Sequence, residues 1–346
     1  MSSSKQDYLF WISVTHFVPQ VGFVSSMLFG GILLFLTGYG ASKNFGSYKY
    51  LLSAFTLLGM AFATMEIIVF PNVHNYRAGF LFFSFENTFG ITDIRYRNIP
   101  LAVYTFFYAV TISLLSVQFI YQYWALFDNT KLRYFTGCYI PIWISYCTFF
   151  GLQYALGTIF FLKTDKPAES YLREEMLLRY HVNITDLPSM ALVAYNPSDG
   201  SVRWRNIMGT INICIIVNVQ YSVMIYCGWS MHTHMEDKIR NFSESLKKLN
   251  KQFFKSLVMQ ITAPTLILFI PISIINFIPV FNFDISFPSG ALLCSFTLYP
   301  AMDSMIVMHV VTEYKHAARK VITKAKMVIK DKSMSRVEST TLHTIS

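Results

Sequence analysis

Two carboxylic acids, Glu66 and Asp303, stand inside long apolar stretches of this chain. An ionised side chain in hydrocarbon is costly, so such a residue needs a partner, a proton or a function. Glu66 is interpreted as a residue of a pocket or gate, or alternatively as a carboxylic acid at the headgroup boundary. Asp303 is interpreted as part of a polar switch with Ser53, Gln118 or Gln260, the alternative being a static hydrogen-bonded network.

An aromatic and polar face follows Pro100, a residue type that is tolerated at the start of a helix. Tyr104, Phe107, Tyr108 and Thr111 recur at i, i+3, i+4 and i+7, which places them on one face of a helix. This face predicts the wall of a ligand pocket. The alternative interpretation is packing against neighbouring helices.

Three prolines, Pro264, Pro271 and Pro279, fall within one apolar stretch. Proline removes a backbone hydrogen bond and bends a helix. The pattern therefore predicts either a hinge about which the inner half of the helix swings, or a fixed bend.

Sequence motifs of catalysis are absent. The chain has no Walker-type phosphate loop, no Gly-x-Ser-x-Gly elbow and no His-Glu-x-x-His pair. His232 and His234 lie close together in the sequence but lack a third ligand. We therefore expect no enzymatic activity, no cofactor and no metal site.

These residues belong to seven stretches that are long and apolar enough to cross a bilayer, which takes about 20 mostly apolar residues. The stretches cover residues 17–39, 50–69, 99–123, 134–162, 207–231, 257–281 and 290–312. Of the 346 residues, 53% are hydrophobic and only 14% are charged, against about 25% charged in soluble domains. We predict an all-α membrane protein, a bundle of seven transmembrane helices.

Basic residues are concentrated on one side of this bundle. When alternate loops are assigned to opposite sides, one side holds 18 of the 28 Lys and Arg residues with 7 acids, and the other holds 10 of each. Cytoplasmic loops are enriched in Lys and Arg, so the N-terminus is predicted outside and the tail inside. This is the topology of a G-protein-coupled receptor. We assign residues 1–312 to the transmembrane receptor domain and residues 313–346 to a cytoplasmic tail.

The tail begins with an amphipathic pattern between Tyr314 and Val328, in which apolar residues recur at i, i+3, i+4 and i+7 with lysines between them. This pattern predicts a helix on the inner leaflet, the alternative being a solvated basic tail. The net charge of +9 is explained by membrane lipid and a cytosolic partner, and we expect no binding to nucleic acid.

Two Asn-x-Ser/Thr patterns lie on opposite sides of the predicted membrane. Asn183 is followed by Ile184 and Thr185 in an outer loop, and Asn241 is followed by Phe242 and Ser243 in an inner loop. Only an acceptor outside the cytoplasm meets the glycosylation machinery. We therefore expect a glycan on Asn183 and none on Asn241.

Four motifs occur in order along the chain. They are Lys-Asn-Phe-Gly-Ser-Tyr-Lys-Tyr-Leu at 43–51, the set Glu66, Pro71 and His74, the run Gln-Phe-Phe-Lys-Ser-Leu-Val-Met-Gln at 252–260 with Pro264 and Pro271 after it, and Tyr299-Pro300-Ala301-Met302-Asp303. Together they resemble the Str-type serpentine chemoreceptors of nematodes, over about residues 10–320.

The resemblance implies an olfactory-type receptor in the plasma membrane of sensory cilia. Such a receptor binds a small, hydrophobic, odorant-like ligand and activates a heterotrimeric G protein. The resemblance also implies activation or coupling roles for Gln122, Tyr123, Gln260, Pro264, Pro271, Tyr299, Pro300 and Asp303. Two positions depart from the family pattern: Gln122 stands where an arginine is expected between two tyrosines, and Ser304 stands where proline is usual.

A ligand-gated seven-helix ion channel and a transporter are the alternative functions. Insect odorant channels have their N-terminus inside, which conflicts with the charge distribution of this chain. A transporter would need more charge within the membrane than Glu66 and Asp303.

Overall fold

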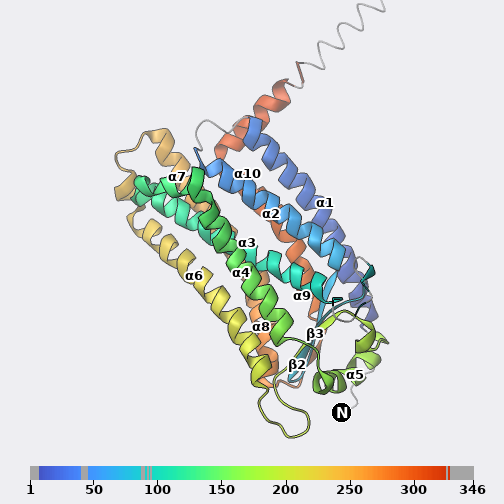
Figure 1. The fold of residues 1–346 in the computed structure, drawn as a ribbon. Coiled ribbons are helices and arrows are strands. Elements are labelled where there is room, and N and C mark those ends of the chain that lie inside the picture. Colours follow the sequence, from blue (N-terminus) through green and yellow to red (C-terminus); the bar gives the residue numbers. More distant parts are fainter. Residues whose placement is uncertain are drawn as a thin grey trace, which may run out of the picture.

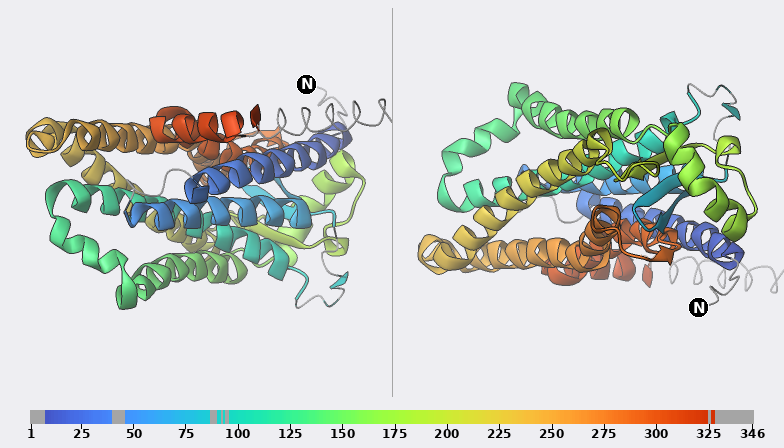
Figure 2. Two further views of the ribbon diagram at one scale, coloured as in Figure 1. Left: turned by 90° about the horizontal axis from the view of Figure 1, so that it is seen from above. Right: turned by 90° about the horizontal axis from the view of Figure 1, so that it is seen from below.

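Long helices run side by side in the computed structural model, which describes residues 8–39, 46–86, 90–91, 93, 96–324 and 326–327 (Figures 1 and 2). Within these residues, six helical segments are long and apolar enough to span a bilayer. They include α1 (Leu9–Tyr39), α2 (Tyr48–Val69), α3 (Ile99–Phe127), α4 (Ile140–Phe161), α6 (Trp204–Ile239) and the segment Gly290–Val310.

The proline-rich stretch supplies the seventh span in two helices. Helix α7 (Glu244–Pro264) and helix α8 (Ile270–Phe281) are joined by a π-helical turn, Thr265–Phe269. Pro264 is the last residue of α7, and Pro271 lies in the first turn of α8. Each proline removes one backbone hydrogen bond, so a wider turn between them is a physical consequence of their spacing. The resulting bundle confirms the predicted fold class.

The last span is also interrupted. Helix α9 (Gly290–Leu293) and helix α10 (Tyr299–Val310) are joined by the 3-10 segment Cys294–Leu298. Helix α1 packs closely on this segment, because a Cβ atom at Gly22 would lie only 2.5 Å from Cβ of Thr297. Residues 312–324 form a further helix, on which the buried Tyr314 hydroxyl lies 3.0 Å from Oγ1 of Thr37. Val328, the end of the predicted amphipathic pattern, lies outside the described residues.

A four-stranded antiparallel sheet covers one end of the bundle, and the sequence did not predict it. Strands β1 (Pro71–Tyr76) and β2 (Gly79–Ser84) form a hairpin, with Tyr76 opposite Gly79 and the turn residue Arg77 at φ 46°. Strands β3 (Ser189–Val193) and β4 (Ser286–Phe287) complete the order β3-β2-β1-β4. The sheet therefore joins three segments that are far apart in the chain.

Strands β1, β2 and β3 are buried on both faces, whereas the short β4 is partly exposed. Side chains alternate between the faces of a strand, so Phe80 and Phe82 join the core of the bundle while Leu81 and Phe83 pack under α5 (Lys166–Tyr180). Asp165 caps the N-terminus of helix α5, because its side chain accepts a hydrogen bond from the backbone N–H of Ala168 at 3.2 Å. The bundle is thus covered by two layers, first the sheet and then α5.

Candidate functional site

A small apolar cavity lies directly under the sheet, with a volume of about 70 Å³. Its walls come from α3, α4, α6, α8, the last span and the sheet, and they include Tyr104, Thr105, Tyr108, Tyr154, Thr158, Ile213, Ile275, Asn276, Phe296, Phe80 and Phe82. The residues that line it are mostly aromatic or aliphatic. A cavity of this kind fits a small apolar molecule.

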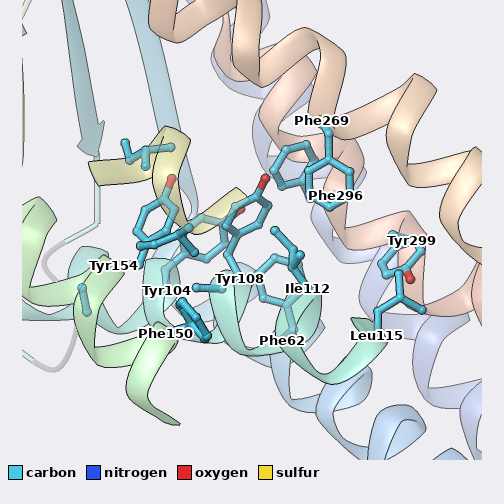
Figure 3. Packing of buried hydrophobic residues seen from close by; sticks show 14 of the residues in the cluster. Phe62, Tyr104, Tyr108, Ile112, Leu115, Phe150, Tyr154, Phe269, Phe296 and Tyr299 are labelled. Atoms are coloured by element: carbon cyan, nitrogen blue, oxygen red, sulfur yellow. The ribbon is translucent and has the colours of Figure 1, made fainter. Parts of the chain in front are cut away.

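Stacked aromatic rings hold the cavity in shape. The Tyr108 ring stacks on Phe296 with centroids 5.5 Å apart and meets Tyr154 edge to face at 5.7 Å. The Tyr104 ring stacks on Phe62 at 5.4 Å. Figure 3 shows these rings converging from different helices. Such pairs add specific geometry to simple burial of apolar surface.

One hydroxyl group in this apolar site has no partner. Within the described residues, the hydroxyl of Tyr108 is buried and forms no hydrogen bond, whereas the buried hydroxyl of Tyr104 lies beside the carboxyl group of Glu66. A buried polar group without a partner is uncommon and costs free energy. The Tyr108 hydroxyl can donate one hydrogen bond, so the cavity can orient a molecule that carries an acceptor.

Only part of the face predicted on helix α3 lines the cavity. Tyr104 and Tyr108 do so, whereas Thr111 bonds to the backbone carbonyl of Phe107 within its own helix at 2.9 Å. Phe107 is partly buried and packs against the hydrophobic core. Glu66 is fully buried beside the hydroxyls of Tyr104 and Thr297. It therefore lies next to the cavity without being one of its lining residues.

Reasoning from the sequence missed the other half of the cavity. Tyr154, Phe296 and the sheet residues Phe80 and Phe82 come from three separate parts of the chain. The short apolar, aromatic-rich run at residues 80–83, bounded by Gly79 and Ser84, was the available signal for a strand, but the segment lies in a loop between two strong helical patterns.

A buried polar network occupies the other half of the bundle. The Gln260 side chain donates a hydrogen bond from Nε2 to Oδ1 of Asp303 at 2.7 Å, and both residues are buried. The Tyr48 hydroxyl lies beside the Gln122 side chain and near Asp303. The structure thus brings together three predicted coupling residues, Gln122, Gln260 and Asp303, around Tyr48.

The remaining predicted coupling residues surround this network. Tyr299 and Pro300 begin α10, where the Tyr299 ring meets Phe55 edge to face at 6.5 Å. A Cβ at Gly59 would lie 2.9 Å from Cβ of Pro300, so glycine allows α2 and α10 to approach closely. The Tyr123 ring stacks on Phe127 at 4.6 Å, away from Asp303.

Gln118, by contrast, does not join Asp303. Among the described residues, its buried amide group forms no hydrogen bond. Asp303 therefore pairs with Gln260, one of the three partners suggested from the sequence.

A second polar cluster fastens α5 to the sheet. Oε1 of Glu175 lies 3.4 Å from Nε2 of His74, and it accepts hydrogen bonds from Arg179 at 3.0 Å and Ser286 at 2.6 Å. Burial raises the pKa of the Glu175 carboxyl group, but hydrogen bonds from His74, Ser286 and Arg179 outweigh it and lower the pKa to about 2. Burial lowers the pKa of His74, against the influence of Glu175. The cluster connects β1, α5 and β4.

Asn183 is exposed and lies just after α5, at the same end of the molecule as the sheet. Asn241 is exposed in the turn between α6 and α7. Accessibility therefore permits a glycan at either residue, and the topology alone distinguishes them.

Seven spans around a small internal cavity are the architecture of G-protein-coupled receptors. Residues 15–319 match the family of serpentine-type seven-transmembrane GPCR chemoreceptors called Str. The chain is 36% identical over 308 residues to the G-protein coupled receptor str-33 of Caenorhabditis elegans, covering 87% of this chain and 88% of that protein. It is 26% identical over 330 residues to serpentine receptor class r-10 of Caenorhabditis briggsae, covering 94% and 95%.

The chain belongs to the Str family of serpentine chemoreceptors. The resemblance noted from the four motifs is confirmed. The protein is a multi-pass membrane receptor of a non-enzymatic class, and its relatives support a chemosensory receptor over the ion channel and the transporter.

Proposed function

We propose that the cavity under the sheet binds the ligand of this receptor, and that the ligand is small, largely apolar and carries a hydrogen-bond acceptor. The observation that supports this most directly is the buried, unpartnered hydroxyl of Tyr108 in a largely apolar cavity of about 70 Å³. A matching acceptor would relieve the cost of leaving this group unpaired. An odorant-like molecule matches the polarity of this lining.

The bound ligand biases an equilibrium between two arrangements of the inner half of the bundle. Gln260 on α7 and Asp303 on α10 hold these helices together in the arrangement seen here. The π turn, with Pro264 at the end of α7 and Pro271 at the start of α8, provides a place where this span can bend. Outward movement of α7 would open a cytoplasmic groove for a heterotrimeric G protein. Gln122, Tyr123, Tyr299 and Pro300 are the further candidates for this coupling.

We place the receptor in the plasma membrane of a sensory cilium, with a glycan on Asn183 outside and residues 313–346 as a cytoplasmic tail. Supporting observations are the charge asymmetry of the loops and the exposed position of Asn183. Localisation of a tagged receptor in sensory neurons tests this placement.

The ligand site is tested by a screen of small apolar molecules, with calcium or cyclic-nucleotide readout in a heterologous cell. For any active molecule with an acceptor, Tyr108→Phe should raise the half-maximal concentration roughly 2- to 10-fold, because it removes only one hydrogen bond of about 0.5–1.5 kcal/mol. Tyr139→Phe, an exposed tyrosine outside the cavity, is the matched control. Equal potency in wild type and Tyr108→Phe, for every active molecule, would place the ligand elsewhere.

A further inference from the structure

A basic cleft opens at the cytoplasmic end of the bundle, away from the ligand cavity. It lies between α7, the end of α10 and the start of the helix at residues 312–324, and has a volume of about 630 Å³. Its basic groups are Lys247, Lys248, Lys251, Lys255, Lys315 and His309, and the carboxylate of Glu244 also lines it.

The lysines line the cleft because of their spacing. Lys247, Lys251 and Lys255 follow one another at intervals of four residues, which places them on one face of α7. With a rise of about 1.5 Å per residue, this row extends along the helix for about 12 Å. Lys315 approaches from the opposite wall. An anion in the cleft would therefore meet positive charge at several positions along the axis of α7.

Acidic residues neutralise only part of this charge. Lys247 pairs with Glu244 at 2.8 Å, and Lys251 pairs with Glu236 at 2.7 Å, at exposed positions where ion pairs are weak. Within the described residues, Lys248, Lys255 and Lys315 form no ion pair. Three of the five lysines are therefore available to an external anion.

The cleft is both anchored and amphipathic. Gln252 on α7 accepts hydrogen bonds from the backbone N–H and the hydroxyl of Thr312, both at 3.1 Å, so its two walls are fixed to each other. Met259 and Val310 add apolar surface to the lining. Lys255 stands just before the apolar stretch that begins at residue 257, which places it at the membrane boundary.

We propose that this cleft binds the headgroup of a phosphoinositide in the inner leaflet. The lipid phosphodiester would lie near Lys255 at the boundary, and the ring phosphates would reach the lysines closer to the cytosol. A lipid whose headgroup carries a single phosphate is too short to contact lysines along the whole of this row. Clusters of cytoplasmic lysines beside a membrane helix are the common recognition element for such lipids. The proposal concerns binding and stands independently of the proposed ligand and coupling roles.

The test uses the full-length receptor in nanodiscs with a headgroup-labelled phosphatidylinositol bisphosphate as probe. Each lysine near an anionic surface contributes about fivefold in affinity, so Lys248→Gln/Lys255→Gln should weaken binding by roughly 25-fold. The matched control is Lys49→Gln/Lys238→Gln, which removes the same charge from the cytoplasmic face outside the cleft. Thermal unfolding of both double variants checks that the receptor remains folded.

Selective loss of binding in the cleft variant supports the site. Equal loss in the control variant would mean diffuse attraction to the cytoplasmic face and would overturn it. Equal binding of phosphatidylserine at matched lipid charge would show that ring phosphates are not required and would overturn the assignment to a phosphoinositide. Tight binding of soluble inositol trisphosphate without membrane lipid, or displacement of the probe by an acidic peptide alone, would assign the cleft to a soluble anion or to a protein.

Discussion

The hydrogen bond between Gln260 and Asp303 is expected to hold the receptor in its resting arrangement. Gln260→Met keeps the length of the side chain but cannot donate, so Asp303 stays buried on α10 without its partner on α7. If α7 moves away from α10 on activation, the bond exists only in the closed arrangement. The variant therefore penalises the closed arrangement and should raise signalling without ligand.

The size of this effect follows from the burial of both groups. Leaving one buried polar group unsatisfied costs about 1–3 kcal/mol, which shifts the equilibrium roughly 5- to 150-fold toward the open arrangement. Replacing both partners with apolar side chains removes the unpaired group and can be nearly neutral. Gln260→Met/Asp303→Leu should therefore signal closer to wild type than Gln260→Met does.

The measurement is nucleotide exchange on the G protein without ligand, at matched surface expression. Thr262→Val is the control, because Thr262 is exposed on α7 and bonds only to the carbonyl of Val258 in its own helix, at 2.7 Å. Unchanged basal exchange in Gln260→Met, or a loss of surface expression with normal signalling by the remaining receptors, would show that the bond is structural and carries no switch.

Three further outcomes follow from close packing, topology and protonation. Gly22→Ala should lower the free energy of unfolding by about 1–3 kcal/mol, because the added Cβ would collide with Thr297. Gly31→Ala is the control and should have no such effect, because its added Cβ would meet no atom within 4 Å. Thermal unfolding of both variants in detergent tests this difference. Glycosidase should shift the mobility of wild type and Asn241→Gln but not of Asn183→Gln, and the reverse pattern would invert the topology. The pKa of Glu175 is lowered to about 2, so this carboxylate stabilises the folded receptor above pH 4.5, and the stabilisation should be lost as the pH falls toward 2. The melting temperature should therefore fall less over this pH range in Glu175→Gln than in wild type.

The sequence predicted the spans well because membrane helices carry a strong local signal. A run of about 20 apolar residues has few alternatives in hydrocarbon, where the backbone must satisfy its own hydrogen bonds. The π turn between Pro264 and Pro271 was predictable as an interruption but not as a specific geometry. The pairing of Gln260 with Asp303 could be proposed because both are polar groups at similar depth in an apolar segment.

The sheet could not be predicted for a physical reason. Strands β1, β2, β3 and β4 are short, and each depends on partners from a distant part of the chain. Two-sided burial of β2 also removes the clear apolar and polar alternation of a surface strand. Because Phe80 and Phe82 form the outer wall of the cavity, missing the sheet meant missing half of the site.

The last span carries residues of both the ligand cavity and the Gln260–Asp303 contact, so it connects them directly. Phe296, which stacks on Tyr108 in the cavity, precedes Asp303 by seven residues, or about 10 Å along a helix. Phe296 itself belongs to the 3-10 segment that joins α9 to α10, and 3-10 turns within a helix often mark a hinge. A ligand that displaces the Phe296 ring therefore acts on the same segment that carries Asp303. Transmission along this single span needs no chain of side-chain contacts across the bundle.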